Sequence, residues 1–231
     1  MTVRAILMDF NGVIIDDEPI QMQAYKDVLG AEGVEVTEES YMGSLGMDEA
    51  AFVRNAYQVC GKECDEAKMP DLIAAKQAKW REMIDKELPL FEGITNFVET
   101  MAEEFSLGIV SMAPRDEIDL VLEMAGLTQH FPVIISAEDV SRHKPDPECF
   151  RVGFRELDAW RTATGHLPMT HGECLVIEDS PPGIVGARTA GLPVLGVTNT
   201  VSADALRTAG ASAVAKDLRD WFPESIRRVF V

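Results

Sequence analysis

Long apolar runs, closely spaced cysteine pairs and a surplus of basic residues are all missing from this sequence. The apolar N-terminal segment is interrupted by Asp9 and Asn11 and lacks a small-residue cleavage site, so it fits neither a signal peptide nor a membrane span. None of the four cysteines forms a C-x-x-C pair, so free buried thiols are the expectation. These absences favour a cytoplasmic protein.

The scarcity of basic residues also bears on partners, because the formal net charge is −18. Too few lysines and arginines are present to replace the counterions of a nucleic acid or of an anionic membrane, and neither is an expected partner. An acidic protein that binds a phosphate ester needs a local positive site, which draws attention to single lysines and to a divalent metal. We expect a monomer that binds a small phosphorylated metabolite.

Short apolar runs alternate with helical patterns in much of the chain. The runs predicted as buried strands are 3–8, 107–110, 133–135, 175–177 and 194–197. Helices are predicted at 115–125, 147–157, 184–190 and 203–209. Near-continuous apolar strands separated by helices indicate a parallel sheet covered on both faces. We therefore predict a doubly wound α/β core formed by residues 1–15 and 91–231.

Residues 16–90 break this alternation. Helical patterns occur at 20–29, 49–59 and 71–84, without a convincing strand between them. Charge and proline interrupt the pattern at 16–19 and at 88–90. We interpret residues 16–90 as an inserted all-helical cap domain. A second irregular stretch, 160–172, is predicted to be an extended surface loop.

Polar residues stand at the carboxyl ends of the predicted strands. Asp9 follows the first strand, Ser111 the second, and Glu178 and Asp179 the fourth, while Lys144 lies in the connection after the third. Ligands of open α/β sheets bind outside this edge. We therefore expect these five residues to meet at one rim.

Each group has a defined task if the ligand is a phosphate ester. Asp9 can attack phosphorus and form an aspartyl-phosphate, which divides the transfer into two steps. Lys144 and the Ser111 hydroxyl can hold the transferring oxygens. Taken alone, each motif has a plainer explanation, such as a turn, a helix cap or a solvated charge. All four motifs in order make coincidence a poor explanation.

A metal site is predicted beside the attacking carboxylate. Mg²⁺ prefers carboxylate and carbonyl oxygens together with water and phosphate. Asp9, the backbone carbonyl of Asn11 and Asp179 suit this preference, with Glu178 as a close or indirect ligand.

These motifs resemble, in order and spacing, the four motifs of the haloacid dehalogenase superfamily. They are Asp-Phe-Asn-Gly-Val at 9–13, Ser111, Lys144 within His-Lys-Pro-Asp-Pro, and Val-Ile-Glu-Asp-Ser-Pro-Pro-Gly at 176–183. The likeness spans almost the whole chain. It is closest to the branch with a helical cap inserted after the first motif, which includes β-phosphoglucomutase and many sugar-phosphate phosphatases. The resemblance implies a Rossmann-like core, a mobile cap and a Mg²⁺ cofactor.

The resemblance also implies roles for individual residues. Asp9 is expected to be the nucleophile. The residues expected to bind phosphate are Ser111, Met112 and Lys144, and Lys144 is also counted among the catalytic residues. The expected metal site consists of Asp9, Asn11, Glu178 and Asp179.

Asn11 departs from the family pattern. Phosphatases and mutases of the family usually have an aspartate two residues after the nucleophile, where it acts as acid and base. A neutral amide can donate a hydrogen bond but cannot protonate a leaving oxygen, and acid–base help amounts to about 10²- to 10⁴-fold in rate. Asn11 has three alternative explanations. It is an engineered substitution, or the chain is a natural enzyme that uses another acid, or it is a natural chain that has lost ordinary turnover. Glu18 is our hypothesis for the substitute acid.

Several functions remain open from the sequence alone. We favour a Mg²⁺-dependent phosphatase acting on a small, sugar-phosphate-like phosphomonoester. A β-phosphoglucomutase-like transferase is the nearest alternative, and a phosphonate hydrolase would need a Schiff-base lysine in the cap. A binding protein that holds a phosphorylated ligand without turnover would also explain Asn11. A dehalogenase needs no magnesium, so the pair Glu178 and Asp179 argues against it.

Overall fold

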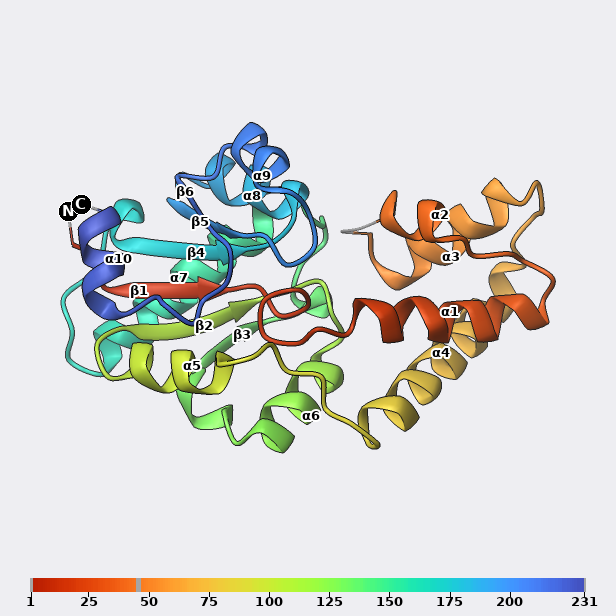
Figure 1. The fold of residues 1–231 in the computed structure, drawn as a ribbon, viewed down its shortest axis with the longest axis horizontal. Coiled ribbons are helices and arrows are strands. Elements are labelled where there is room, and N and C mark those ends of the chain that lie inside the picture. The colour runs from red at the N-terminus through yellow and green to blue at the C-terminus, as the bar shows by residue number, and fades with distance from the viewer. Residues whose placement is uncertain (1, 45–46, 231) are drawn as a thin grey trace. The chain divides into compact units, whose positions relative to one another are not determined.

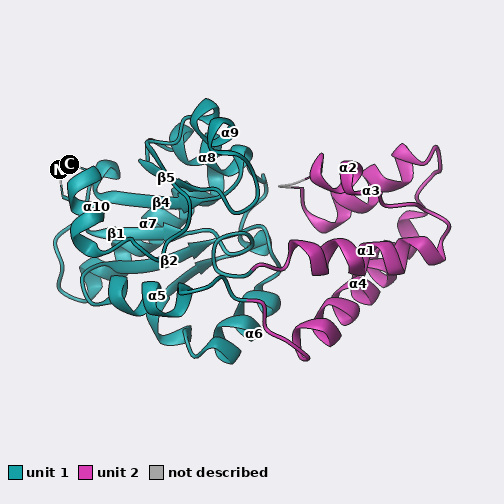
Figure 2. Cartoon of the chain, viewed as in Figure 1, with its two compact units in different colours: residues 1–15, 90–231 teal, residues 16–89 magenta. Residues whose placement is uncertain are grey.

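The computed structural model describes residues 2–44 and 47–230 of the chain. The chain forms two compact units, coloured separately in Figure 2. Unit 1 comprises Met1–Ile15 and Leu90–Val231, and unit 2 comprises Asp16–Pro89. Leu90 belongs to unit 1 because it forms a β-bridge with Ile15.

The centre of unit 1 is a six-stranded sheet with the order β3-β2-β1-β4-β5-β6, in which all neighbouring strands are parallel (Figure 1). Its strands are β1 (Ala5–Met8), β2 (Ser106–Val110), β3 (Val133–Ile135), β4 (Cys174–Glu178), β5 (Val194–Val197) and β6 (Ala213–Ala215). The predicted parallel α/β core is therefore confirmed. β6, which is only three residues long and partly buried, was not predicted.

Helices cover both faces of this sheet. They are α5 (Ile94–Ala102), α6 (Arg115–Ala125), α7 (Glu148–Ala163), α8 (Pro181–Thr189), α9 (Ala203–Ala209) and α10 (Pro223–Val229). Successive side chains of a strand point to opposite faces. Accordingly, Ala5 and Leu7 pack in one core cluster with Phe150 of α7 and Ile184 of α8. Figure 1 shows α5 and α10 in front of the sheet and α7 behind it. Short 3₁₀ turns connect the elements at Thr128–His130, Ala137–Asp139 and His171–Glu173.

Helix α7 continues to Ala163. The predicted helix 147–157 is therefore too short, and the predicted loop 160–172 is wrong for its first four residues. Arg161 explains the extension. Its side chain is buried, and its Nη1 donates to the Arg4 carbonyl at 3.1 Å and to Ser106 Oγ at 2.7 Å. A charged residue reaching across the base of the sheet therefore anchors the last turn.

Unit 2 consists of helices in its described residues. They are α1 (Glu18–Ala31), α2 (Glu38–Met42), α3 (Glu49–Val59), the 3₁₀ turn Glu66–Lys68 and α4 (Met69–Ile84). Pro19 stands in the first turn of α1, where a missing N–H costs nothing. Three aromatic rings, Tyr25, Tyr41 and Phe52, pack together in the core of this unit. Trp80 and Ile84 of α4 are fully buried.

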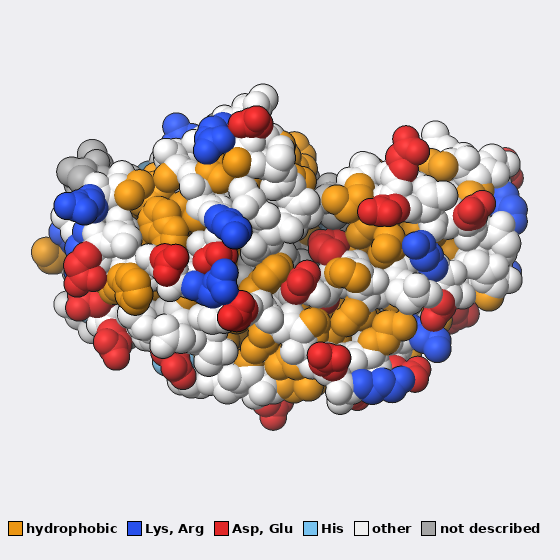
Figure 3. Space-filling model, in the orientation of Figure 1, with side chains coloured by type: hydrophobic (Ala, Val, Ile, Leu, Met, Phe, Trp, Pro, Cys, Tyr) orange, Lys and Arg blue, Asp and Glu red, His pale blue; other side chains and the backbone are white. Residues whose placement is uncertain are grey.

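All four cysteines are free thiols, but only Cys149 and Cys174 are buried, so the expectation of burial is wrong for Cys60 and Cys64. Within residues 2–44 and 47–230, every helix is too short or too polar to cross a bilayer. Figure 3 shows acidic side chains on both units, with lysine and arginine side chains dispersed among them, as the net charge of −18 requires.

Candidate active site

The register of the sheet brings two acidic residues together. Met8, the last residue of β1, is paired with Ile177 of β4. The following residues, Asp9 and Glu178, are therefore neighbours at the carboxyl edge of the sheet. The Asp9 N–H continues the ladder by donating to the Ile177 carbonyl at 2.9 Å.

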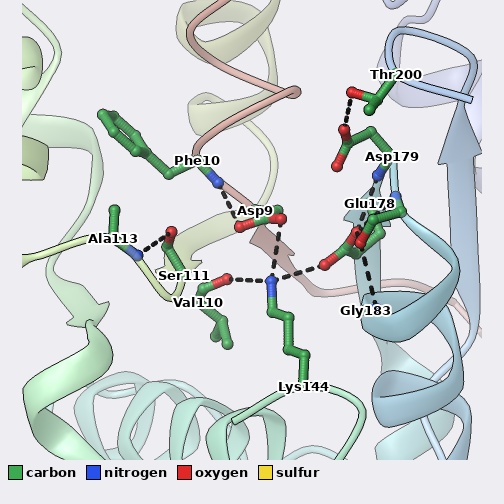
Figure 4. Close-up of polar contacts among 11 residues, drawn as sticks. Asp9, Phe10, Val110, Ser111, Ala113, Lys144, Glu178, Asp179, Gly183 and Thr200 are labelled. Atoms are coloured by element: carbon green, nitrogen blue, oxygen red, sulfur yellow. Dashed lines mark hydrogen bonds and ion pairs between the residues drawn. The ribbon is translucent and has the colours of Figure 1, made fainter. Parts of the chain in front are cut away.

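Lys144 reaches this edge from the loop that precedes α7. Its Nζ lies 3.0 Å from Asp9 Oδ2 and 2.7 Å from Glu178 Oε1, and it donates to the Val110 carbonyl at 3.2 Å (Figure 4). The Phe150 ring lies 5.3 Å from the ammonium group. Lys144, Asp9 and Glu178 are all buried, so water screens their charges little.

Burial and mutual charge perturb all three groups. Burial, followed by the negative charge of Glu178, raises the pKa of Asp9 to about 8. Burial acts to raise the pKa of Glu178, but the charge and hydrogen bond of Lys144 hold that pKa below its ordinary value. Burial would lower the pKa of Lys144, yet the two carboxylates raise it above its usual range. Lys144 is therefore a fixed positive charge within an acidic cluster.

Asp179 completes a group of three carboxylates that could hold a metal ion. One oxygen each from Asp9, Glu178 and Asp179 lie within 4.8 Å of one another. Three carboxylates and one ammonium group leave a formal charge that a divalent cation would balance. An all-oxygen donor set of this kind fits Mg²⁺.

The two oxygens of Glu178 are engaged by the protein. Oε1 accepts from Lys144, and Oε2 accepts from the N–H groups of Asp179 and Ser180, each at 3.0 Å, and from Ser180 Oγ at 2.9 Å. These contacts orient the turn between β4 and α8. They favour Glu178 as a residue that holds Lys144 and the turn in place.

Two glycines allow the carboxylates to approach the backbone. Gly12 has a φ of 75°, and a Cβ built on it would lie 1.9 Å from Asp179 Oδ2. A Cβ on Gly183, in the first turn of α8, would lie 1.7 Å from Glu178 Oε1. Any side chain at either position would displace an acidic group of the site.

Ser111 and Met112 follow β2 beside this cluster. The Ser111 N–H donates to the Ile135 carbonyl at 2.9 Å, and Ser111 Oγ accepts from the Ala113 N–H at 3.1 Å. Figure 4 shows Ser111 next to Val110, whose carbonyl accepts from Lys144. Met112 is half-buried and packs against the core. The phosphate-binding roles of both residues stay predictions.

The remaining predicted residues lie in different parts of the chain. Asn11 is half-buried and forms a β-bridge with Ile15 in the loop after β1. Glu18 is the first residue of α1 in unit 2, where Tyr41 donates its hydroxyl to Glu18 Oε2 at 2.5 Å. The catalytic role of Glu18 also stays a prediction.

Sequence reasoning missed two residues that support the site. The Thr200 hydroxyl donates to Asp179 Oδ2, and Asn199 Nδ2 donates to the Gly12 carbonyl at 2.8 Å. Both follow β5, which ends at Val197. The rule applied to the other strands, that polar residues after a parallel strand lie at the binding edge, would have found them.

The chain is similar to known proteins in sequence and in fold. A model of haloacid dehalogenase-like hydrolases matches residues 6–197. The chain is 30% identical over 223 residues to Protein SUPPRESSOR OF QUENCHING 1, chloroplastic, of Arabidopsis thaliana, covering 94% of this chain but only 20% of that protein. It is 28% identical over 226 residues to validoxylamine A 7'-phosphate phosphatase of Streptomyces hygroscopicus subsp. limoneus, covering 94% of this chain and 95% of that enzyme.

A solved structure has the same fold. β-Phosphoglucomutase from Clostridium difficile superposes with a TM-score of 0.84 at 19% identity, over 99% of this chain and 97% of that one. The match over residues 6–197 shows that the chain belongs to the haloacid dehalogenase-like hydrolase family. The resemblance drawn from the four motifs is therefore confirmed.

Proposed function

We propose that this chain is a Mg²⁺-dependent phosphatase that hydrolyses a small, sugar-phosphate-like phosphomonoester through an aspartyl-phosphate on Asp9. The observation that carries the proposal is the contact of Lys144 with both Asp9 and Glu178, beside Asp179, at the carboxyl edge of the sheet. The phosphatase relative at 28% identity supports the substrate class.

The side chains suggest how the first step proceeds. The Phe10 N–H, at 2.8 Å from Oδ1, and Lys144, at 3.0 Å from Oδ2, orient the Asp9 carboxylate. An Asp9 oxygen bonds to phosphorus while the bond from phosphorus to the ester oxygen breaks, and that oxygen keeps the electron pair and needs a proton. Lys144 and the Ser111 hydroxyl stabilise the charge on the transferring oxygens.

Asp9, Asp179 and the Asn11 carbonyl would hold the Mg²⁺ ion, with Glu178 close by. The bound ion would favour the ionised form of Asp9 and reduce its repulsion from the phosphate. Thr200 and Gly12 keep the Asp179 carboxylate in place for this role.

Proton transfer is assigned to Glu18, because Asn11 cannot supply it. In the first step, Glu18 gives its proton to the leaving oxygen. In the second step, a water attacks the phosphorus of the aspartyl-phosphate, and the Glu18 carboxylate takes a proton from that water. The bond from phosphorus to the Asp9 oxygen breaks, which releases inorganic phosphate and restores the Asp9 carboxylate.

A panel of phosphomonoesters tests the function, with phosphate release measured with and without Mg²⁺. We expect release by the native chain in Mg²⁺ and none by Asp9→Asn. Asn11→Asp should raise the rate by up to about 10²-fold, the lower end of acid–base help, because Glu18 already supplies part of it. Phosphate release only by Asn11→Asp would instead indicate a binding protein, and isomerised sugar phosphate without release would indicate a mutase.

A further inference from the structure

Unit 1 contains a cavity that the proposed reaction does not use. Its volume is about 430 Å³, including the open space at its mouth, and sites for small molecules usually measure about 300–1,000 Å³. Val13, Ile94 and Leu218 line it and are buried, whereas the lining residues Glu92 and Arg219 are exposed. The cavity therefore has an apolar floor and a charged mouth, which suits a small molecule with an apolar body and one polar head group.

The charged residues at the mouth form a linked group. Arg219 Nη1 lies 2.7 Å from Glu92 Oε2, and Arg219 Nη2 lies 2.9 Å from Asp217 Oδ2. The Arg219 N–H also donates to Asp217 Oδ1 at 3.1 Å. The hydrogen bond from the Arg219 side chain holds the pKa of Asp217 below its ordinary value. Two carboxylates then face one guanidinium group, so the mouth has a formal charge of about −1 at neutral pH.

Hydrogen-bond acceptors face the same cavity. Glu92 contacts Arg219 through Oε2, which leaves Oε1 as an acceptor. Asn199 also lines the cavity, and its Nδ2 donates to the Gly12 carbonyl at 2.8 Å, which leaves Oδ1 as a second acceptor. A protonated amine matches both the acceptors and the negative charge, whereas a carboxylate would meet repulsion.

Asn199 joins this cavity to the carboxylate cluster. The Gly12 backbone that it holds packs on Asp179, because a Cβ on Gly12 would lie 1.9 Å from Asp179 Oδ2. The next residue, Thr200, donates its hydroxyl to the same Asp179 oxygen (Figure 4). Hydrogen bonds in series polarise one another, so a donor bound at Asn199 Oδ1 would strengthen the bond from Asn199 to Gly12.

We propose that this cavity binds a small, protonated organic amine, and that the bound amine tightens Mg²⁺ binding at Asp179 through Asn199 and Gly12. The binding half of the proposal stands on the shape and charge of the cavity. The coupling half rests on the proposed function, which places Mg²⁺ beside Asp179. Linkage requires that the amine and Mg²⁺ raise each other's affinity by the same factor.

Benzylamine, benzyl alcohol and benzoate test the binding half, because they share one apolar body and differ in charge. In methyl-labelled protein with EDTA, benzylamine should shift the NMR signals of Val13, Ile94 and Leu218 with a Kd on the order of millimolar, as expected for a ligand of this size. Benzyl alcohol should bind more weakly, and benzoate most weakly.

Glu92→Gln should weaken benzylamine binding about fivefold, because a hydrogen bond to a charged acceptor becomes one to a neutral acceptor. Glu104→Gln is the matched control. Glu104 is also an exposed glutamate beside α5, and it pairs with Arg227 at 2.5 Å. It does not line the cavity, so its replacement should leave the affinity for benzylamine unchanged.

Calorimetric titration with Mg²⁺ tests the coupling half. At 0.15 M salt, where repulsion between the two cations is largely screened beyond about 8 Å, saturating benzylamine should tighten Mg²⁺ binding about fivefold, the lower end of coupling between sites. Asn199→Ala should lose this effect, and Glu104→Gln should keep it. Circular dichroism checks that each variant is folded.

Several results would overturn the proposal. Benzoate that binds as tightly as benzylamine, equal effects of Glu92→Gln and Glu104→Gln, or signals that shift only elsewhere in the chain would exclude the amine site. A Mg²⁺ affinity that benzylamine leaves unchanged or weakens would exclude the coupling. If benzylamine binds as expected but the native chain releases no phosphate from any ester in Mg²⁺, the proposed function fails and the amine site stands.

Discussion

Removing the Lys144 ammonium should destabilise unit 1 strongly and in a pH-dependent way. Lys144→Met keeps a side chain of similar length but leaves Glu178, which is 0% exposed, without its 2.7 Å partner, and Asp9 without its 3.0 Å partner. Breaking a buried ion pair by removing one partner costs about 3–5 kcal/mol. We expect a loss in this range in the free energy of unfolding, measured by urea denaturation at pH 7 in the presence of EDTA.

The loss of unfolding free energy in Lys144→Met should depend on pH, and the pKa of Glu178 decides in which direction. Lys144 lowers the pKa of Glu178, so the contribution of the pair is present above the ordinary pKa of a glutamate and is lost as the pH falls through the lowered value. Without Lys144, burial raises the pKa of Glu178, so Lys144→Met takes up a proton at a higher pH, and its deficit in unfolding free energy relative to the native protein should narrow as the pH is lowered from neutral toward about 4.

Lys86→Met is the matched control, because Lys86 is 69% exposed and pairs with Glu82 on the surface at 2.9 Å. It should change the free energy of unfolding by less than about 0.5 kcal/mol. A Lys144→Met protein as stable as this control would refute the reasoning. A difference in unfolding free energy between Lys144→Met and the native protein that stays constant or widens as the pH falls would also refute it.

Two further substitutions examine how the backbone and the loop after β5 support Asp179. Gly12→Ala should cost about 1–3 kcal/mol in unfolding free energy and lower Mg²⁺-dependent phosphate release, because its Cβ would lie 1.9 Å from Asp179 Oδ2. Gly61→Ala, also at positive φ but with nothing within 4 Å, should cost less and leave release unchanged, and equal effects would contradict the steric argument. Thr200→Val removes the hydroxyl that donates to Asp179 and should weaken Mg²⁺ binding about 10- to 100-fold in a calorimetric titration, whereas unchanged affinity would exclude an orienting role.

Local sequence patterns were enough to predict most of unit 1. The runs at 133–135 and 194–197 coincide with β3 and β5, and the helix ending before Gly126 coincides with α6. Buried parallel strands are apolar on both faces, and a glycine in the left-handed region ends a helix, so both features are visible without the rest of the chain.

Elements that depend on distant contacts were missed. The last turn of α7 is held by bonds from Arg161 to the starts of β1 and β2, which lie 157 and 55 residues away in the chain. The short strand β6 consists of only three residues, Ala-Val-Ala, and is defined by its pairing with β5. Tertiary contacts override weak local preferences in such segments.

The sequence alone determined which chemical groups stand at the strand ends, because the order of strands and polar residues along the chain is a local property. It thus supplied Asp9, Ser111, Lys144, Glu178 and Asp179 as candidates. Only the tertiary structure decided that Lys144 contacts both Asp9 and Glu178, that Thr200 bonds to Asp179, and that Tyr41 bonds to Glu18. Strand register and burial set these distances and pKa shifts, and both arise only when segments far apart in the chain pack together.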